Sequence, residues 1–190
     1  MSMKIRAMYF TGTGTTAKIT TSIAYSMWSE MKDAGFEKEA DINFAVKAAR
    51  DKEYIFDEKD IVVFGVPVIA GRVPNVLLKF LDTLKGGGAI AIPVVLYGNR
   101  NFDDALIELR NILEDKDFRT VAAAAFIGEH SFSKTLAAGR PDAADMKIAD
   151  AFAKEAADKI LWIMRDSAAH EVEMSHTLDM MGPVEVEGCD

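Results

Sequence analysis

A loop of threonines and glycines, Thr11-Gly12-Thr13-Gly14-Thr15-Thr16, constrains the fold of this chain more than any other segment. It follows an apolar run at residues 5–10 and precedes a helical pattern that begins near Ala17. A strand that ends in such a loop and leads into a helix is typical of phosphate sites, because the first helical turn offers unpaired N–H groups and the positive end of the helix dipole. The loop contains no Lys or Arg, so hydroxyls and backbone dipoles would have to bind the anion.

This loop matches neither of two common phosphate-binding motifs. A P-loop would end in Gly-Lys-Ser/Thr, and the dinucleotide-binding motif would need a glycine where Ala17 stands. The alternative interpretation is a helix N-terminus capped by threonine, without any ligand. Of the two, the residues favour phosphate binding.

Composition and charge narrow the class of protein. At 190 residues the chain is long enough for one domain with a substantial core. A net charge of −8 argues against nucleic acid and against an anionic membrane surface, and it is compatible with a basic partner. Cys189 is the only cysteine, so an internal disulfide and a cysteine-ligated cluster are excluded and a cytoplasmic location is expected. We expect neither a signal peptide nor a membrane span.

Apolar patterning predicts alternating strands and helices. Strands are expected at residues 4–10, 60–66, 92–97 and 121–127, with a weaker one near 42–46. Helices are expected at 17–34, from near Pro74 to the glycines at 86–88, at 102–116 and at 142–164. This order predicts an α/β fold with a doubly wound parallel sheet and helices on both faces. We expect the domain to span residues 1–165, followed by an acidic C-terminal tail at 166–190.

Three loops should meet at one edge of this sheet, where the strands end and where parallel sheets bind ligands. They are the threonine-glycine loop, residues 67–74 after the third strand, and residues 97–102 after the fourth strand. The second loop offers an apolar surface, a flexible Ala70-Gly71 peptide and the cation of Arg72, and the third offers an aromatic ring and an amide. A flat, mostly apolar ring system with a phosphate tail would fit between these loops.

The sequence resembles the flavodoxin-like FMN-binding family, and most closely the flavodoxin half of bacterial flavodoxin–ferredoxin fusion proteins. The segments that carry the resemblance are residues 9–14 (YFTGTG), 65–74 (GVPVIAGRVP), 97–100 (YGNR), 125–132 (AFIGEHSF) and 138–142 (AGRPD). The resemblance implies five strands in the order 2-1-3-4-5 and FMN held without a covalent bond. Thr15 departs from the family, which usually has asparagine there. The chain lacks the cysteine-rich cluster motifs of the fusion proteins, so its redox partner would be a separate protein, such as a ferredoxin or a reductase. Whether the chain forms a homodimer is left open.

We predict the cofactor-binding residues from these loops. They are Thr11, Gly12, Thr13, Gly14, Thr15, Thr16, Pro67, Val68, Ile69, Ala70, Gly71, Arg72, Tyr97, Gly98, Asn99, Arg100 and His130. Tyr97 either stacks on the flavin or simply ends a strand. Arg72 either compensates charge on a reduced flavin or lies exposed, and His130 lines the flavin or a substrate pocket. No catalytic residue and no metal site is predicted, since the other histidines lack ligand spacing.

The sequence favours a flavodoxin-like electron carrier. In this interpretation the flavin performs the redox chemistry, and a backbone peptide at Ala70-Gly71 hydrogen-bonds the flavin N5. Two other classes stay open. One is a flavin-dependent NAD(P)H:quinone or nitro reductase on the same fold, and the other is a non-redox module that binds a different phosphorylated ligand.

Overall fold

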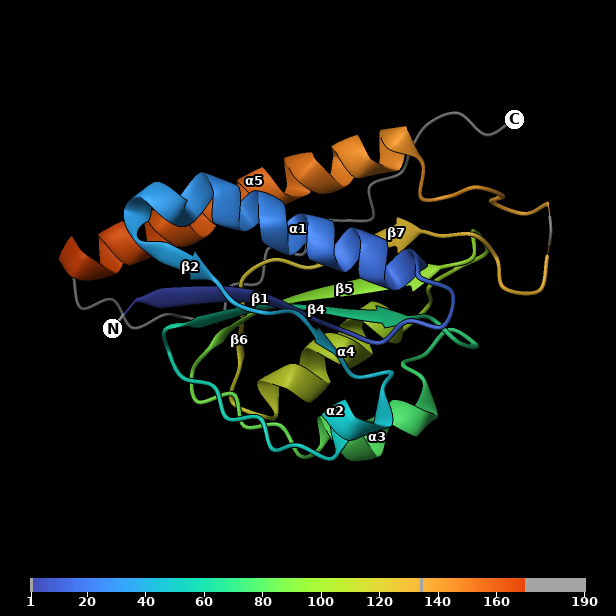
Figure 1. Ribbon diagram of the computed structural model, residues 1–190, viewed down its shortest axis with the longest axis horizontal. Coiled ribbons are helices and arrows are strands. Elements are labelled where there is room, and N and C mark those ends of the chain that lie inside the picture. The colour runs from blue at the N-terminus through green and yellow to red at the C-terminus, as the bar shows by residue number, and fades with distance from the viewer. Residues whose placement is uncertain (1, 134, 170–190) are drawn as a thin grey trace.

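The computed structural model describes residues 2–133 and 135–169, in which strands and helices alternate around one central sheet (Figure 1). The strands are β1 Met3–Tyr9, β2 Phe36–Lys38, β3 Ile42–Asn43, β4 Asp60–Pro67, β5 Ile90–Tyr97, β6 Arg119–Thr120 and β7 Ala124–Ile127. The helices are α1 Thr15–Met31, α2 Lys47–Arg50, α3 Asn75–Leu81, α4 Ala105–Glu114 and α5 Ala143–Ala169. A short 3₁₀ turn at Lys32–Ala34 extends α1, and Gly35 ends it at φ 88°.

The sheet is parallel and has five strand positions. β4 pairs with β1 on one side and with β5 on the other, while β2 and β3 pair in turn with the free side of β1. β6 and β7 pair in the same way with the far side of β5. The two interrupted edge strands therefore each occupy one position, and the predicted order 2-1-3-4-5 is confirmed.

Two apolar cores cover the two faces of the sheet. Alternate residues of β4 face opposite sides, so Ile61 and Val63 belong to one core while Val62 and Phe64 belong to the other. The first core is closed by α1 and α5, and the second by α3 and α4, in agreement with the layers seen in Figure 1. The predicted helices on both faces are thus confirmed.

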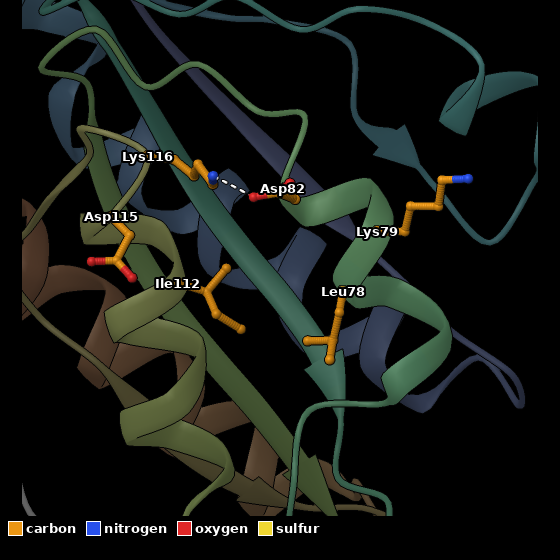
Figure 2. Close-up of a pocket in the computed structure, with 6 residues that line it drawn as sticks. All are labelled: Leu78, Lys79, Asp82, Ile112, Asp115 and Lys116. Carbon is orange, nitrogen blue, oxygen red and sulfur yellow. Dashed lines mark hydrogen bonds and ion pairs between the residues drawn. The ribbon is translucent and has the colours of Figure 1, made fainter.

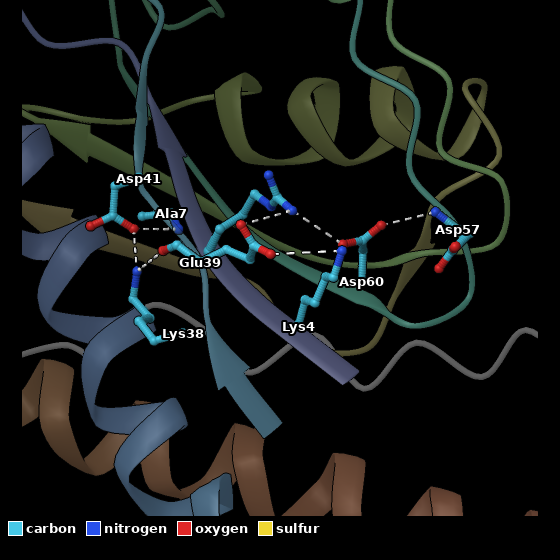
Figure 3. Close-up of polar contacts among 8 residues, drawn as sticks. Lys4, Ala7, Lys38, Glu39, Asp41, Asp57 and Asp60 are labelled. Atoms are coloured by element: carbon cyan, nitrogen blue, oxygen red, sulfur yellow. Dashed lines mark hydrogen bonds and ion pairs between the residues drawn. The ribbon is translucent and has the colours of Figure 1, made fainter. Parts of the chain in front are cut away.

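The edge strand beside β1 contains a one-residue bulge. Ile5 pairs with Lys38, whereas Met8 pairs with Ile42, so one extra residue lies between β2 and β3. The Asp41 carboxylate accepts the N–H of Ala7 at 2.9 Å and thereby replaces the missing ladder bond (Figure 3). Sequence patterning placed one weak strand near 42–46 and missed β2, because this three-residue strand carries only one apolar side chain.

Ionic contacts join the start of β1 to its two neighbours. Lys4 and Arg6 on β1 approach Glu39 at 3.6 and 3.9 Å, and Arg6 also pairs with Asp60 on β4 at 3.4 Å (Figure 3). Asp60 in turn accepts the N–H of Asp57 at 3.1 Å. These contacts lie where the strands begin, at the end of the sheet away from the predicted site.

The last described helix runs past the predicted domain boundary. α5 continues to Ala169, four residues into the segment assigned to the acidic tail. Residues 170–190 lie outside the described residues, so the boundary at 165 stays a prediction. Within the described part of the chain, no helix is both long and apolar enough to cross a bilayer.

Asp41→Ala is predicted to destabilise the fold. It leaves the N–H of Ala7, a fully buried residue, without its acceptor, and this should cost about 1–3 kcal/mol in the free energy of unfolding. Urea denaturation measures the loss. Asp51→Ala is the control, since it breaks an exposed pair with Lys47 and should cost no more than about 0.5 kcal/mol. Equal losses for the two variants would contradict the role given to Asp41.

Candidate functional site

The threonine-glycine loop joins β1 to α1 and holds its own conformation. Gly14 caps α1 at φ 95°, a conformation that strongly favours glycine, and its N–H donates to Oγ1 of Thr11 at 2.9 Å. The hydroxyls of Thr13 and Thr15 lie 3.3 Å apart. Neither Gly12 nor Gly14 has any atom within 4 Å of the place where a Cβ would stand, so the loop has an open side. Thr16 differs from the other five residues, because it is only 1 % exposed.

The loop after β4 is a tight two-residue turn. Ile69 and Arg72 exchange two backbone hydrogen bonds at 3.0 and 3.1 Å around Ala70 and Gly71. Both central residues have positive φ, 52° and 73°, as a type I′ turn requires. Ile69 is 57 % exposed and presents an apolar surface beside the turn. The predicted flexible Ala70-Gly71 peptide is therefore a well-defined turn in this structure.

Arg72 is held by a carboxylate and is not a free cation. Its Nε and one terminal nitrogen donate to Glu108 on α4 at 3.0 and 2.7 Å, and the N–H of Val73 donates to the same carboxylate at 2.8 Å. The Arg72 hydrogen bond lowers the pKa of the Glu108 carboxyl below its ordinary value of 4.5; burial opposes this, and the Val73 N–H adds to it. The positive charge predicted for this loop is thus compensated from within the protein.

The loop after β5 begins with Tyr97, whose ring packs against Phe102 with centroids 5.4 Å apart. Asn99 adopts φ 56°, and Arg100 is exposed at the tip. His130, from the loop after β7, lies directly over Gly98, because a Cβ added to Gly98 would stand 2.7 Å from Cδ2 of His130. The Nδ1 of His130 accepts the N–H groups of Phe132 and Ser133, both at 3.1 Å. A neutral His130 therefore carries its proton on Nε2.

Glycines bring the loops at this edge of the sheet into a chain of contacts. Gly71, in the loop after β4, contacts Asp103 in the loop after β5. Gly98, in the loop after β5, contacts His130 in the loop after β7. Gly128 of the last loop lies beside Thr15, with 3.3 Å between its virtual Cβ and Oγ1 of Thr15. The three predicted loops and the loop that carries His130 therefore meet at one edge, as expected for strands that all end there.

Hydrogen bonds and an ion pair hold both ends of the loop between β7 and α5. The N–H of Glu129 donates to the carbonyl of Arg140, and Arg140 forms a two-bonded ion pair with Asp145 on α5. Lys18 on α1 donates to the carbonyl of Pro141 at 2.6 Å. The only lysine in the first turns of α1 is therefore engaged by this loop. These bonds hold His130 and its neighbours against the other loops.

A surface cavity of about 410 Å³ lies elsewhere, between α3 and α4 (Figure 2). It is lined by Leu78, Lys79, Asp82, Ile112, Asp115 and Lys116, and an ion pair between Lys116 and Asp82 crosses it. None of the predicted site residues lines this cavity. Among the described residues, no group of three or more His, Cys, Asp and Glu side chains is arranged to hold a metal ion.

Solved structures with the same fold are flavodoxins and related flavoproteins. Flavodoxin 1 from Bacillus cereus matches 82 % of this chain and 97 % of its own, with a TM-score of 0.60 and 16 % identity. A flavodoxin from the domain Archaea matches 84 % of this chain and 99 % of its own, with a TM-score of 0.55 and 16 % identity. An NADH:FMN oxidoreductase, EmoB, in its apo form matches 80 % of this chain and 88 % of its own, with a TM-score of 0.51 and 16 % identity.

The chain therefore has the flavodoxin fold, as the sequence resemblance implied. At these identities the likeness shows the fold alone. No family model and no curated protein sequence matches this chain. The narrower resemblance to the flavodoxin half of fusion proteins stays a prediction.

Sequence reasoning missed two acidic residues at this edge, Asp103 and Glu108. Asp103 covers the turn at Gly71, and Glu108 compensates Arg72. Glu108 lies within the predicted helix at 102–116, where a charged residue on a helical pattern indicates only a solvated face. The positive φ of Asp103, 42°, has no sequence signal beyond the Asn101-Phe102-Asp103 loop composition.

Glu108→Gln is predicted to lower stability by about 1 kcal/mol at neutral pH, since a charge-assisted pair with a half-exposed arginine is lost. Because folding lowers the Glu108 pKa, its contribution is fully present above pH 4.5 and disappears as the pH falls through the lower folded-state value. Urea denaturation of wild type and variant across this range measures the change. Glu53→Gln, which breaks an exposed pair with Lys85, is the control. A stability difference between wild type and Glu108→Gln that stays unchanged at acidic pH would refute the role given to the Glu108 carboxylate.

Proposed function

We propose that this protein binds FMN and transfers electrons to or from a separate protein partner. The observation that carries the proposal is the chain of contacts that joins four loops at the carboxyl edge of a flavodoxin-fold sheet. Ligands of parallel α/β sheets bind at this edge, between loops of this kind. FMN, when bound, supplies the one-electron and two-electron chemistry.

The threonine-glycine loop fits the phosphate end of such a ligand. Its open side, at Gly12 and Gly14, lets an anion approach the backbone, and α1 behind it is 17 residues long. The hydroxyls of Thr11, Thr13 and Thr15 can turn from their internal hydrogen bonds to donate to phosphate oxygens. Since Lys18 is bound to the carbonyl of Pro141, we assign hydroxyls and backbone dipoles as the principal phosphate ligands.

The second and third loops fit the ring end. Ile69 offers an exposed apolar side chain, and Tyr97 offers a half-buried aromatic ring held by Phe102. We assign Tyr97 to stacking on the flavin. His130 offers an Nε2 proton at the side of Gly98, where it can donate to a ligand carbonyl or ring nitrogen. We do not assign Arg72 to compensating negative charge on a reduced flavin, because its guanidinium is already paired with the Glu108 carboxylate.

The partner proposed is a separate redox protein, such as a ferredoxin or a reductase. The net charge of −8 favours a basic docking surface on that partner, because charge complementarity speeds association. A cytoplasmic location agrees with the single cysteine, Cys189. A homodimer stays a prediction.

Addition of FMN to the purified protein is predicted to give the absorption spectrum of a bound flavin. Thr11→Val with Thr13→Val should weaken FMN binding at least about tenfold, since hydrogen bonds to a charged phosphate are lost. Thr21→Val is the matched control, because its hydroxyl bonds only the carbonyl of Ala17 within α1. The expected result is full affinity in the control and weak binding in the double variant. Unchanged affinity in the double variant would overturn the phosphate assignment, and no flavin uptake by the wild type would overturn the function.

A flavin-dependent NAD(P)H reductase is the second candidate, favoured by the Nε2 proton donor of His130 and compatible with the fold shared with an NADH:FMN oxidoreductase. Steady consumption of NADH or NADPH by the FMN-loaded protein with a quinone separates the two. We predict that consumption stays at the rate of free FMN, as expected for a carrier. Turnover well above that rate, and lost in His130→Phe, would establish the reductase instead.

A further inference from the structure

The groove between α3 and α4 has an apolar floor that faces solvent. Leu78 on α3 and Ile112 on α4 point toward one another across it (Figure 2). Leu78 is 37 % exposed, and Ile112 is half-buried. Apolar side chains that gather in a surface hollow favour contact with a further molecule, because covering them removes apolar area from water.

Charged side chains of both signs flank this floor. Lys116 and Asp82 form an ion pair across the groove, so their charges are already compensated. Lys79 on α3 and Asp115 at the end of α4 stand on opposite sides of the groove (Figure 2). In the part of the chain that the structure describes, neither of these two side chains has an ion pair or a hydrogen bond. The groove therefore offers a free cation on the α3 side and a free anion on the α4 side.

This arrangement is complementary to itself. α3 and α4 each lead from the end of one parallel strand back to the start of the next, so the two helices run in similar directions. A two-fold axis along the groove places α3 of each copy over α4 of the other. Leu78 of each copy then meets Ile112 of the other, and Lys79 of each copy meets Asp115 of the other. The same patch thus supplies both halves of every contact.

The charge balance of the groove favours a second copy over a strongly charged partner. Two lysines and two aspartates line the groove and balance one another, whereas the whole chain carries a net charge of −8. A strongly charged partner gains little at a neutral surface, and two acidic chains repel each other least where their facing charges cancel.

We propose that this protein forms a two-fold homodimer through the groove between α3 and α4, held by contacts of Leu78 with Ile112 and of Lys79 with Asp115 across the interface. The residues that line the groove lie in the second halves of both helices, and none of the predicted cofactor-binding residues is among them. The dimer contact therefore uses none of the loops at the carboxyl edge and is independent of FMN. Because the groove is small, the dimer is weak and depends on protein concentration.

Sedimentation equilibrium of the full chain, from micromolar to millimolar concentration, tests the dimer. Wild type should shift from monomer toward dimer across this range. Lys79→Asp places two aspartates at each charge contact, and Asp115→Lys places two lysines there, so each variant should associate with itself at least about tenfold more weakly. Lys147→Asp is the control, because it makes the same change in net charge at an exposed residue of α5, on the opposite face of the sheet. It should associate as wild type does.

A mixture of the two variants separates this interface from any other. In a mixed dimer every charge contact joins an aspartate to a lysine, so equimolar Lys79→Asp and Asp115→Lys chains should associate with each other at near the wild-type affinity. The mixture and each variant alone are compared by sedimentation at the same total concentration. A wild type that stays monomeric throughout, a dimer that Lys79→Asp leaves unchanged, or variants that do not associate when mixed would each overturn the proposal.

Discussion

Close approach between loops at glycine positions is the interaction on which the rest of this site depends. The parallel sheet makes every strand end at the same edge, but it does not by itself bring the loops into contact. Gly71, Gly98 and Gly128 do so, because each lacks the Cβ that would meet a neighbouring loop. A side chain at Gly71 or Gly98 would displace Asp103 or His130, and with it the link between two loops.

Three cations at this edge are already engaged by groups within the protein. Arg72 is compensated by Glu108, Lys18 is bound to the carbonyl of Pro141, and Arg140 is bound to Asp145. In the proposed function, the phosphate would therefore be bound by hydroxyls and backbone dipoles.

Much of the fold was predictable from sequence, since long apolar runs such as 60–66 and 92–97 indicate buried parallel strands, whereas the strand order was implied by the family resemblance. The interrupted edge strand β2–β3 was not, because its bulge depends on Asp41 replacing a ladder bond that no periodicity reveals. At the site, sequence placed the loops correctly but left Arg72 open between two roles. Its partner, Glu108, lies 36 residues away on a helix surface, and such a pairing depends on tertiary packing that one sequence does not contain.

The central claim is that the four loops form one site for a mononucleotide. The measurement that tests it most directly is a map of backbone amide NMR signals during titration with FMN. We predict that signals from residues 11–16, 69–72, 97–103 and 128–130 shift together with a single dissociation constant. Shifts confined to one of these loops, or centred on the groove between α3 and α4, would contradict the account.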